Sequence, residues 1–149
     1  MDCNRIPTTP LRPKLRPAVY TGAMPRWNLD DIAWARFDHT KVDARLIALV
    51  KAASLVERNG GDYARYLCRV FDGDPEFQAA ARRWGTEEVQ HGTALGRWAA
   101  LADPGFDPEA AAGRFTQGFR VPFDAEHSVR GSRARELVAR CIVETGTSS

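Results

Sequence analysis

Apolar residues recur at helical spacing along two long segments of the chain and along a shorter one near its C-terminus. In residues 43–71 the apolar stripe, followed in steps of three and four, consists of Leu46, Val50, Ala53, Glu57, Gly60, Ala64, Leu67 and Phe71. In residues 75–102 the stripe consists of Phe77, Ala81, Trp84, Glu88, His91, Leu95, Trp98 and Ala102. No segment shows the strict alternation of apolar and polar residues that is typical of strands, so the pattern predicts an all-α fold.

The sequence DGDP at 72–75 predicts the end of one helix and the start of the next. We expect Gly73 at the C-terminal end of the first helix, Asp74 as the N-cap of the second and Pro75 as its first residue. Two helices joined by so short a link pack antiparallel as a hairpin. The stretch Asn59-Gly60-Gly61 leaves open an early end of the first helix or an internal bulge, but the apolar spacing continues across it and favours one continuous helix.

The rest of the chain divides into an arm, a crossover and a third helix. Five prolines in residues 1–27 predict an extended arm, followed by one helical domain over 28–149. Prolines and glycines break up residues 103–131, which predicts a long crossover with a short helix at 109–119. Ser132 is expected to cap the third core helix, whose predicted inward stripe is Ala134, Leu137, Cys141 and Glu144.

Polar residues interrupt these apolar stripes at positions that should come together. Glu57 lies 16 residues before Gly73 and Glu88 lies 15 residues after it, so a rise of ~1.5 Å per residue places both about 22 to 24 Å from the turn. His91 follows Glu88 by about one helical turn on the same face, and Glu144 is predicted to face inward from the third helix.

Buried carboxylates are costly unless they are paired, protonated or given a cation. The mixture of carboxylate and imidazole groups at Glu57, Glu88, His91 and Glu144 suits iron or manganese, and zinc is an alternative ion. A buried Glu–His pair without metal is the alternative reading of Glu88 and His91.

These residues resemble the ligands of the ferritin-like di-iron carboxylate superfamily. The stretch EEVQHG at 87–92 is similar to the EENRHG motif of soluble acyl-carrier-protein desaturases. The resemblance implies that Glu57 is a terminal ligand of the first core helix, Glu88 a bridging ligand, His91 the nitrogen ligand on the same iron, and Glu144 the first carboxylate of the second helix pair. It also implies two iron ions in a complete site, with manganese as an alternative, and a desaturase-like or oxygenase-like oxidoreductase. The implied substrate is a fatty-acyl group or another small organic molecule.

The chain departs from that family because it has no second Glu-x-x-His. Neither Glu126-His127 nor Glu136 has the required spacing. We therefore expect an incomplete ferritin-like bundle of three core helices with a long crossover. Such a chain would be a fragment of a longer product, inactive alone and completed by a missing C-terminal segment or by a homodimer; binding of one ion by Glu57, Glu88 and His91 is still expected to be feasible. The alternative is a non-catalytic helical module that pairs with another chain through an apolar face of its third helix.

Composition narrows the partners and the location. The chain has 149 residues, of which 44% are hydrophobic, and its net charge of +2 gives no reason to expect nucleic acid. No apolar run is long enough for a signal peptide or a membrane span, so we expect a cytoplasmic protein. The three cysteines lack the spacing of a disulfide framework or zinc site and are expected to be free. His39 and His127 should lie at the surface, as should Glu87 and Gln90, whereas Gly85, Gly92 and Gly96 predict the close approach of a neighbouring helix.

Overall fold

The structure is a computed structural model that describes residues 27–147, and every regular element in this range is a helix. Three short 3-10 turns come first, η1 (Leu29–Asp31), η2 (Trp34–Arg36) and η3 (His39–Lys41). They are followed by α1 (Ala44–Arg58), α2 (Gly60–Val70), α3 (Pro75–Ala102), α4 (Pro108–Gly118) and α5 (Arg133–Thr147). The predicted all-α class is confirmed for these residues, and none of these helices is long and apolar enough to cross a membrane. The predicted extended arm lies outside the described residues, except for Trp27.

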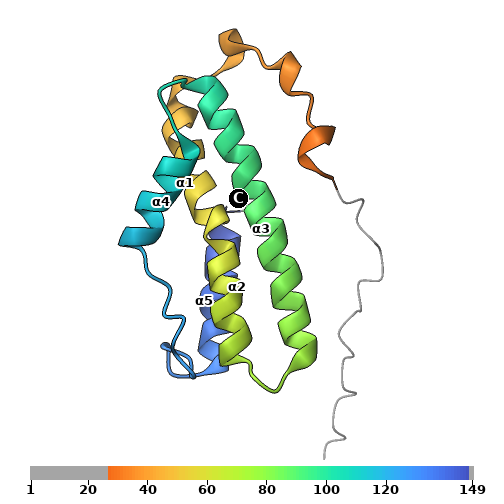
Figure 1. The fold of residues 1–149 in the computed structure, drawn as a ribbon, viewed down its shortest axis with the longest axis vertical. Coiled ribbons are helices and arrows are strands. Elements are labelled where there is room, and N and C mark those ends of the chain that lie inside the picture. The colour runs from red at the N-terminus through yellow and green to blue at the C-terminus, as the bar shows by residue number, and fades with distance from the viewer. Residues whose placement is uncertain (1–26, 148–149) are drawn as a thin grey trace, which may run out of the picture.

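A long helical hairpin forms the centre of the molecule, with α1 and α2 as one arm and α3 as the other (Figure 1). The turn between the arms has the predicted chemistry. Gly73 has a φ of 82°, a left-handed conformation that glycine adopts without strain. Asp74 Oδ1 accepts a hydrogen bond from the Phe77 amide at 3.0 Å, and Pro75 begins α3. The predicted hairpin is therefore confirmed.

The prediction of one continuous helix over 43–71 is wrong at one residue, Asn59, which separates α1 from α2. Asn59 keeps right-handed angles, with φ −72° and ψ −12°, and its carbonyl accepts a hydrogen bond from the Tyr63 amide at 3.1 Å. The two helices therefore follow nearly the same direction (Figure 1). The break coincides with one of the tightest contacts on α3, since a Cβ added at Gly60 would lie 2.4 Å from the Cβ of Glu88.

Glycines of α3 allow the two arms of the hairpin to approach closely. A Cβ at Gly85 would lie 2.4 Å from Ala64 Cβ, and one at Gly92 would lie 2.5 Å from the Arg58 amide nitrogen and 2.7 Å from the Ser54 carbonyl oxygen. The predicted close approach is confirmed. The buried residues of α3 are Ala81, Gly85, Glu88, Gly92, Gly96 and Ala99. The buried face of α3 is therefore centred on its glycines. The predicted stripe shares Ala81 and Glu88 with this face, but its other residues lie beside it.

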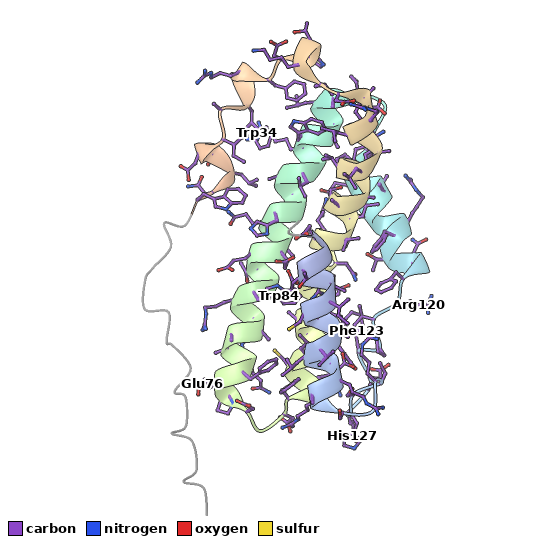
Figure 2. The ribbon with its side chains drawn as sticks, turned by 180° about the vertical axis from the view of Figure 1, so that it is seen from behind. Trp34, Glu76, Trp84, Arg120, Phe123 and His127 are labelled. Atoms are coloured by element: carbon purple, nitrogen blue, oxygen red, sulfur yellow. The ribbon has the colours of Figure 1, made fainter. Side chains whose placement is uncertain are left out.

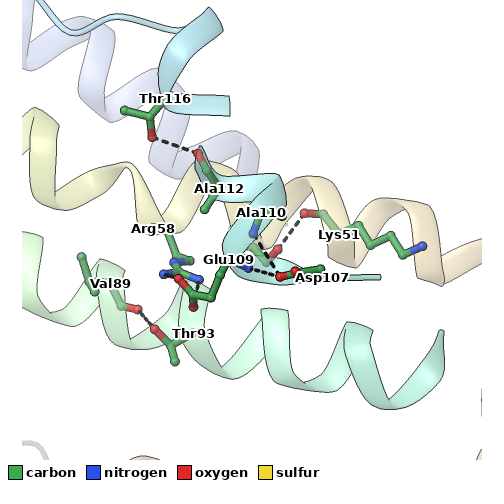
Figure 3. A network of polar contacts seen from close by, with 10 residues as sticks. Lys51, Arg58, Val89, Thr93, Asp107, Glu109, Ala110, Ala112 and Thr116 are labelled. Atoms are coloured by element: carbon green, nitrogen blue, oxygen red, sulfur yellow. Dashed lines mark hydrogen bonds and ion pairs between the residues drawn. The ribbon is translucent and has the colours of Figure 1, made fainter. Parts of the chain in front are cut away.

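Two further helices cover different halves of this hairpin (Figure 1). Near the open end, α4 lies on α1, where Arg58 donates two hydrogen bonds to the Glu109 carboxylate, at 2.7 and 2.8 Å (Figure 3). Near the turn, α5 lies beside α2, and the main hydrophobic cluster joins Tyr66, Leu67, Val70, Phe71, Ala81 and Val121. At the middle of the hairpin, α4 ends its contact with one half and α5 begins its contact with the other.

The segment before α1 lies against α3. The Arg97 guanidinium sits 4.5 Å from the centre of the Trp34 ring, and Phe37 packs edge-on against Trp98 with ring centroids 6.0 Å apart. Trp34 Nε1 also donates a hydrogen bond to the Leu29 carbonyl at 2.8 Å. Aromatic contacts of these short turns therefore hold residues 27–41 along one helix.

The start of α5 was predicted correctly, but its inward face was not. Ser132 Oγ accepts a hydrogen bond from the Arg135 amide at 3.2 Å, as expected of an N-cap. The predicted inward residues Ala134, Leu137 and Cys141 are exposed, whereas Glu136 is fully buried at 0% exposure. The helix is turned so that polar residues with partners on α2 face inward and several apolar residues face outward.

Candidate metal centre

Glu57, Glu88 and His91 meet between α1 and α3, beside the break at Asn59. His91 Nδ1 lies 3.8 Å from Glu57 Oε2 and 3.8 Å from Glu88 Oε1. Each residue offers one ligand atom, and these atoms all lie within 4.8 Å of one another. Within residues 27–147 this is the one cluster of at least three His, Cys, Asp or Glu side chains with such spacing. The structure thus brings together the two acids that the sequence placed at one level of the hairpin, and the imidazole one turn away.

Exposure differs among the three side chains. Glu57 and Glu88 are 17% and 11% exposed, whereas His91 is 43% exposed. The carboxylates therefore lie inside the hairpin and the imidazole lies at its edge, so His91 faces the core less than its position on the predicted stripe suggested. An ion held by these groups could be reached from the His91 side and would keep coordination positions open there.

The surroundings of Glu88 disfavour its charged form. Burial raises the pKa of Glu88 to about 8; a hydrogen bond with Glu57 and repulsion from Glu57 and Glu144 act in the same direction, and Arg140 acts against them. In the metal-free protein at neutral pH, Glu88 is therefore largely protonated. A divalent cation would displace this proton, because ligand carboxylates bind metal in their ionised form.

The fourth predicted ligand, Glu144, lies on α5 and is not part of this three-residue cluster. The helix α5 ends at mid-height of the hairpin (Figure 1). The Glu144 charge acts on Glu88. Its Oε1 lies 2.9 Å from Arg140 Nε, and both atoms are buried. The Arg140 guanidinium carbon lies 4.9 Å from the ring centre of Trp84 and 5.4 Å from that of Tyr63. Figure 2 shows Trp84 on α3 beside α5.

The buried acid Glu136 was not selected from the sequence because it lacks the Glu-x-x-His spacing. Its carboxylate accepts hydrogen bonds from Tyr63 Oη at 2.6 Å, Tyr66 Oη at 2.7 Å and Ser128 Oγ at 2.9 Å. Arg130 Nε lies 3.3 Å from the same carboxylate. Burial raises the pKa of Glu136, but these hydrogen bonds and Arg130 outweigh it and hold the pKa below its ordinary value. Glu136 therefore stays ionised and ties α5 and the crossover to α2.

Trp27 is a second residue that the sequence did not assign to the site. Its indole stacks on the His91 imidazole, with ring centroids 5.8 Å apart and planes 8° from parallel. Gln90, expected to be solvated, donates a hydrogen bond from Nε2 to the Trp27 carbonyl at 2.7 Å. A weak signal was available, since a tryptophan ends an arm otherwise rich in proline and cations. Its partner, however, lies 64 residues further along the chain.

Glu87, His39 and His127 are exposed as predicted. Cys68 and Cys141 are free, and Cys3 lies outside the described residues.

The donor set fits one ion better than it fits a complete two-iron site. Two carboxylates and one imidazole with open positions resemble the facial triad of mononuclear non-haem iron, although that triad has two imidazoles and one carboxylate; manganese also accepts carboxylate and imidazole donors. Comparisons of the chain with protein-family models, with curated proteins and with solved structures found no match. The likeness to ferritin-like carboxylate proteins accordingly rests on the motif residues.

Proposed function

We propose that this chain binds iron or manganese through Glu57, Glu88 and His91, as an oxidoreductase of the ferritin-like carboxylate type, desaturase-like or oxygenase-like. The observation that carries the proposal is the convergence of two mostly buried carboxylates and an imidazole, with ligand atoms within 4.8 Å of one another. Such a metal ion, when bound, supplies oxygen-dependent oxidation chemistry. The chain supplies the ligands, the low-dielectric surroundings and the closure of one face of His91 by Trp27.

A cavity next to the cluster supports a small organic substrate. The cavity of about 270 Å³ lies between the junction of α1 and α2, the end of α4, and α5. Its lining is mostly apolar and includes Val56, Phe115, Phe119 and Val143, but the polar side chains of Asn59, Tyr63, Arg130 and Arg140 also line it, beside Gly60. Gly60 also contacts Glu88, so the cavity and the cluster share a wall. A mostly apolar cavity of this size favours a compact apolar substrate over a long acyl chain.

Metal analysis of purified variants tests the proposal. The protein is loaded anaerobically with Fe²⁺ or Mn²⁺, separated from free metal by gel filtration, and analysed for metal content. We expect bound metal in the wild type and its loss in Glu88→Ala and His91→Ala. Glu87→Ala, on the exposed side of the same turn, is the matched control and should bind like the wild type. Metal-free wild-type protein, or variants that bind as well as the wild type, would refute the proposal.

A second candidate function is a helical interaction module with a metal-free Glu–His pair. The observation in its favour is the outward face of α5, where Val138 and Ile142 are 61% and 68% exposed and Leu137 is 40% exposed. Exposed apolar residues gathered on one helix mark contact sites more often than catalytic ones. Under this reading two copies of the chain associate through α5, and Val138→Asp with Ile142→Asp yields a monomer by light scattering. A wild-type monomer at high protein concentration would exclude it.

A further inference from the structure

The charge around the candidate centre can be counted from its side chains. Glu57, Glu88 and Glu144 bring three negative charges when ionised, and Arg140 brings one positive charge. His91 is neutral as a metal ligand. One divalent ion therefore makes the group electrically neutral, whereas two such ions would leave two excess positive charges.

Arg140 is held where that charge is needed. Its side chain is 22% exposed, and its Nε lies 2.9 Å from Glu144 Oε1. Its guanidinium packs on the faces of Trp84 and Tyr63, at 4.9 and 5.4 Å from the ring centres. Trp84 lies four residues before Glu88 on α3, so Arg140 reaches into the hairpin one turn from the cluster. Stacking on two rings favours the cation at this position.

Two other arginines near this level of the hairpin are engaged elsewhere. Arg58, the next residue after Glu57, is turned away and forms its paired hydrogen bonds with Glu109 on α4. Arg130, on the crossover, lies beside the Glu136 carboxylate, which is a separate site. Arg140 is the cation that acts directly on Glu88.

We propose, on the basis of the proposed function, that Arg140 takes the place of a second metal ion. Its guanidinium neutralises Glu144, so the centre holds a single ion on Glu57, Glu88 and His91, and Glu144 is a charge partner and not a ligand. The consequence differs from the two-iron site that the motif residues imply. A fixed cation supplies charge but no coordination positions, so any reaction at this centre proceeds at one ion.

Manganese titration tests the number of ions directly. Wild-type protein is titrated with Mn²⁺ and followed by electron paramagnetic resonance, together with metal analysis after desalting. We expect one equivalent of bound Mn²⁺ with the hyperfine spectrum of an isolated ion. Two equivalents with the altered spectrum of an exchange-coupled pair would overturn this inference and leave the proposed function standing. No binding at all would overturn both.

A charge cycle separates a charge partner from a ligand. Arg140→Gln leaves the centre more negative and should tighten Mn²⁺ binding by about tenfold or more, whereas Glu144→Gln should weaken it by a similar factor. The double variant restores the wild-type charge and should restore wild-type affinity. If Glu144 is a ligand, the double variant binds Mn²⁺ more weakly than the wild type because a ligand is lost, and the inference fails.

Two controls keep the cycle interpretable. Arg140→Lys keeps the charge and should bind Mn²⁺ like the wild type even though it stacks less well on the two rings. Arg135→Gln changes the net charge equally from an exposed position on α5 and should leave affinity unchanged. Equal tightening by Arg135→Gln and Arg140→Gln would overturn the inference, since the effect would then be one of overall charge. Thermal unfolding by circular dichroism confirms that each variant is folded before titration.

Discussion

Replacing Glu88 with glutamine should stabilise the metal-free protein at alkaline pH. Glutamine has the shape of the protonated acid and can still donate a hydrogen bond to Glu57, but it cannot ionise. In the wild type the pKa of Glu88 is raised by burial, and by its hydrogen bond with Glu57 and the nearby charges, from 4.5 to about 8. The unfolded chain ionises this group at its ordinary pKa, so the folded protein holds a proton that the unfolded chain has already released.

The sign and size of the effect follow from this difference. Between pH 4.5 and about 8 the folded state binds more protons at Glu88, so the wild type loses stability as the pH rises through this window. Below pH 4.5 the contribution is fully present, and above pH 8 the loss is complete. The two pKa values differ by about 3.5, which corresponds to at most about 5 kcal/mol. Glu88→Gln removes this pH-dependent loss.

Urea unfolding of metal-free protein, at a series of pH values from 5 to 9 with a chelator present, measures the free energy of unfolding. We expect the wild-type value to fall with pH relative to that of Glu88→Gln, with the largest gap above pH 8. Glu87→Gln, on the exposed side of the same turn, is the control and should follow the wild type. If the free energy of unfolding depended on pH in the same way for the wild type and Glu88→Gln, ionisation of Glu88 would not destabilise the folded protein. The cluster would then have no electrostatic need for a cation.

Three further predictions concern the packing around the site. Gly92→Ala should lower the free energy of unfolding by about 3 kcal/mol or more, because its Cβ would overlap the facing backbone. Gly113→Ala, with open space around it, should raise the free energy of unfolding by about 0.5 to 1 kcal/mol. Urea unfolding of both variants measures these differences. Glu136→Gln should cost about 2 to 3 kcal/mol at pH 7 and less in acid, because the lowered pKa of Glu136 gives stability that is lost as the pH falls; equal costs at pH 7 and pH 4 would contradict it. Trp27→Ala should weaken Mn²⁺ binding several-fold, because an aromatic ring stacked on His91 limits the rotation of the imidazole. Trp27→Phe should keep the wild-type affinity. Unchanged affinity of Trp27→Ala in calorimetry would show that the stacking has no role in metal binding.

The parts of the fold that depend on local chemistry could be predicted from the sequence. The turn at Gly73 and Asp74 is set by a left-handed glycine and a capping carboxylate, both visible in four residues. Once that turn is known, the rise of a helix fixes which residues of the two arms share a level. Glu57 and Glu88 were paired in this way, and the structure places them side by side.

The orientation of α5 could not be predicted, because its partners are remote. The apolar residues of α5 predict one buried face, whereas the face that is buried is a different one, centred on Glu136. The partners that make burial of Glu136 favourable are hydroxyl groups of Tyr63 and Tyr66, which lie 73 and 70 residues away in the chain. The helical period shows which residues of α5 share a face, but it does not show which face is buried against hydrogen-bond partners on another helix. The stacking of Trp27 on His91 was missed for the same reason.

The break between α1 and α2 and the buried Glu88 side chain meet at Gly60. A side chain at Gly60 would place its Cβ 2.4 Å from the Glu88 Cβ and 2.8 Å from the Glu88 Cγ. Glycine therefore lets the buried carboxylate lie against the opposite helix, at a cost of about 1 kcal/mol in helix propensity. A helix built for stability alone would have alanine here and a shorter apolar residue opposite. The sequence instead keeps a weak helix junction and a destabilised acid at the same level, and a bound cation would offset the cost of ionising that acid.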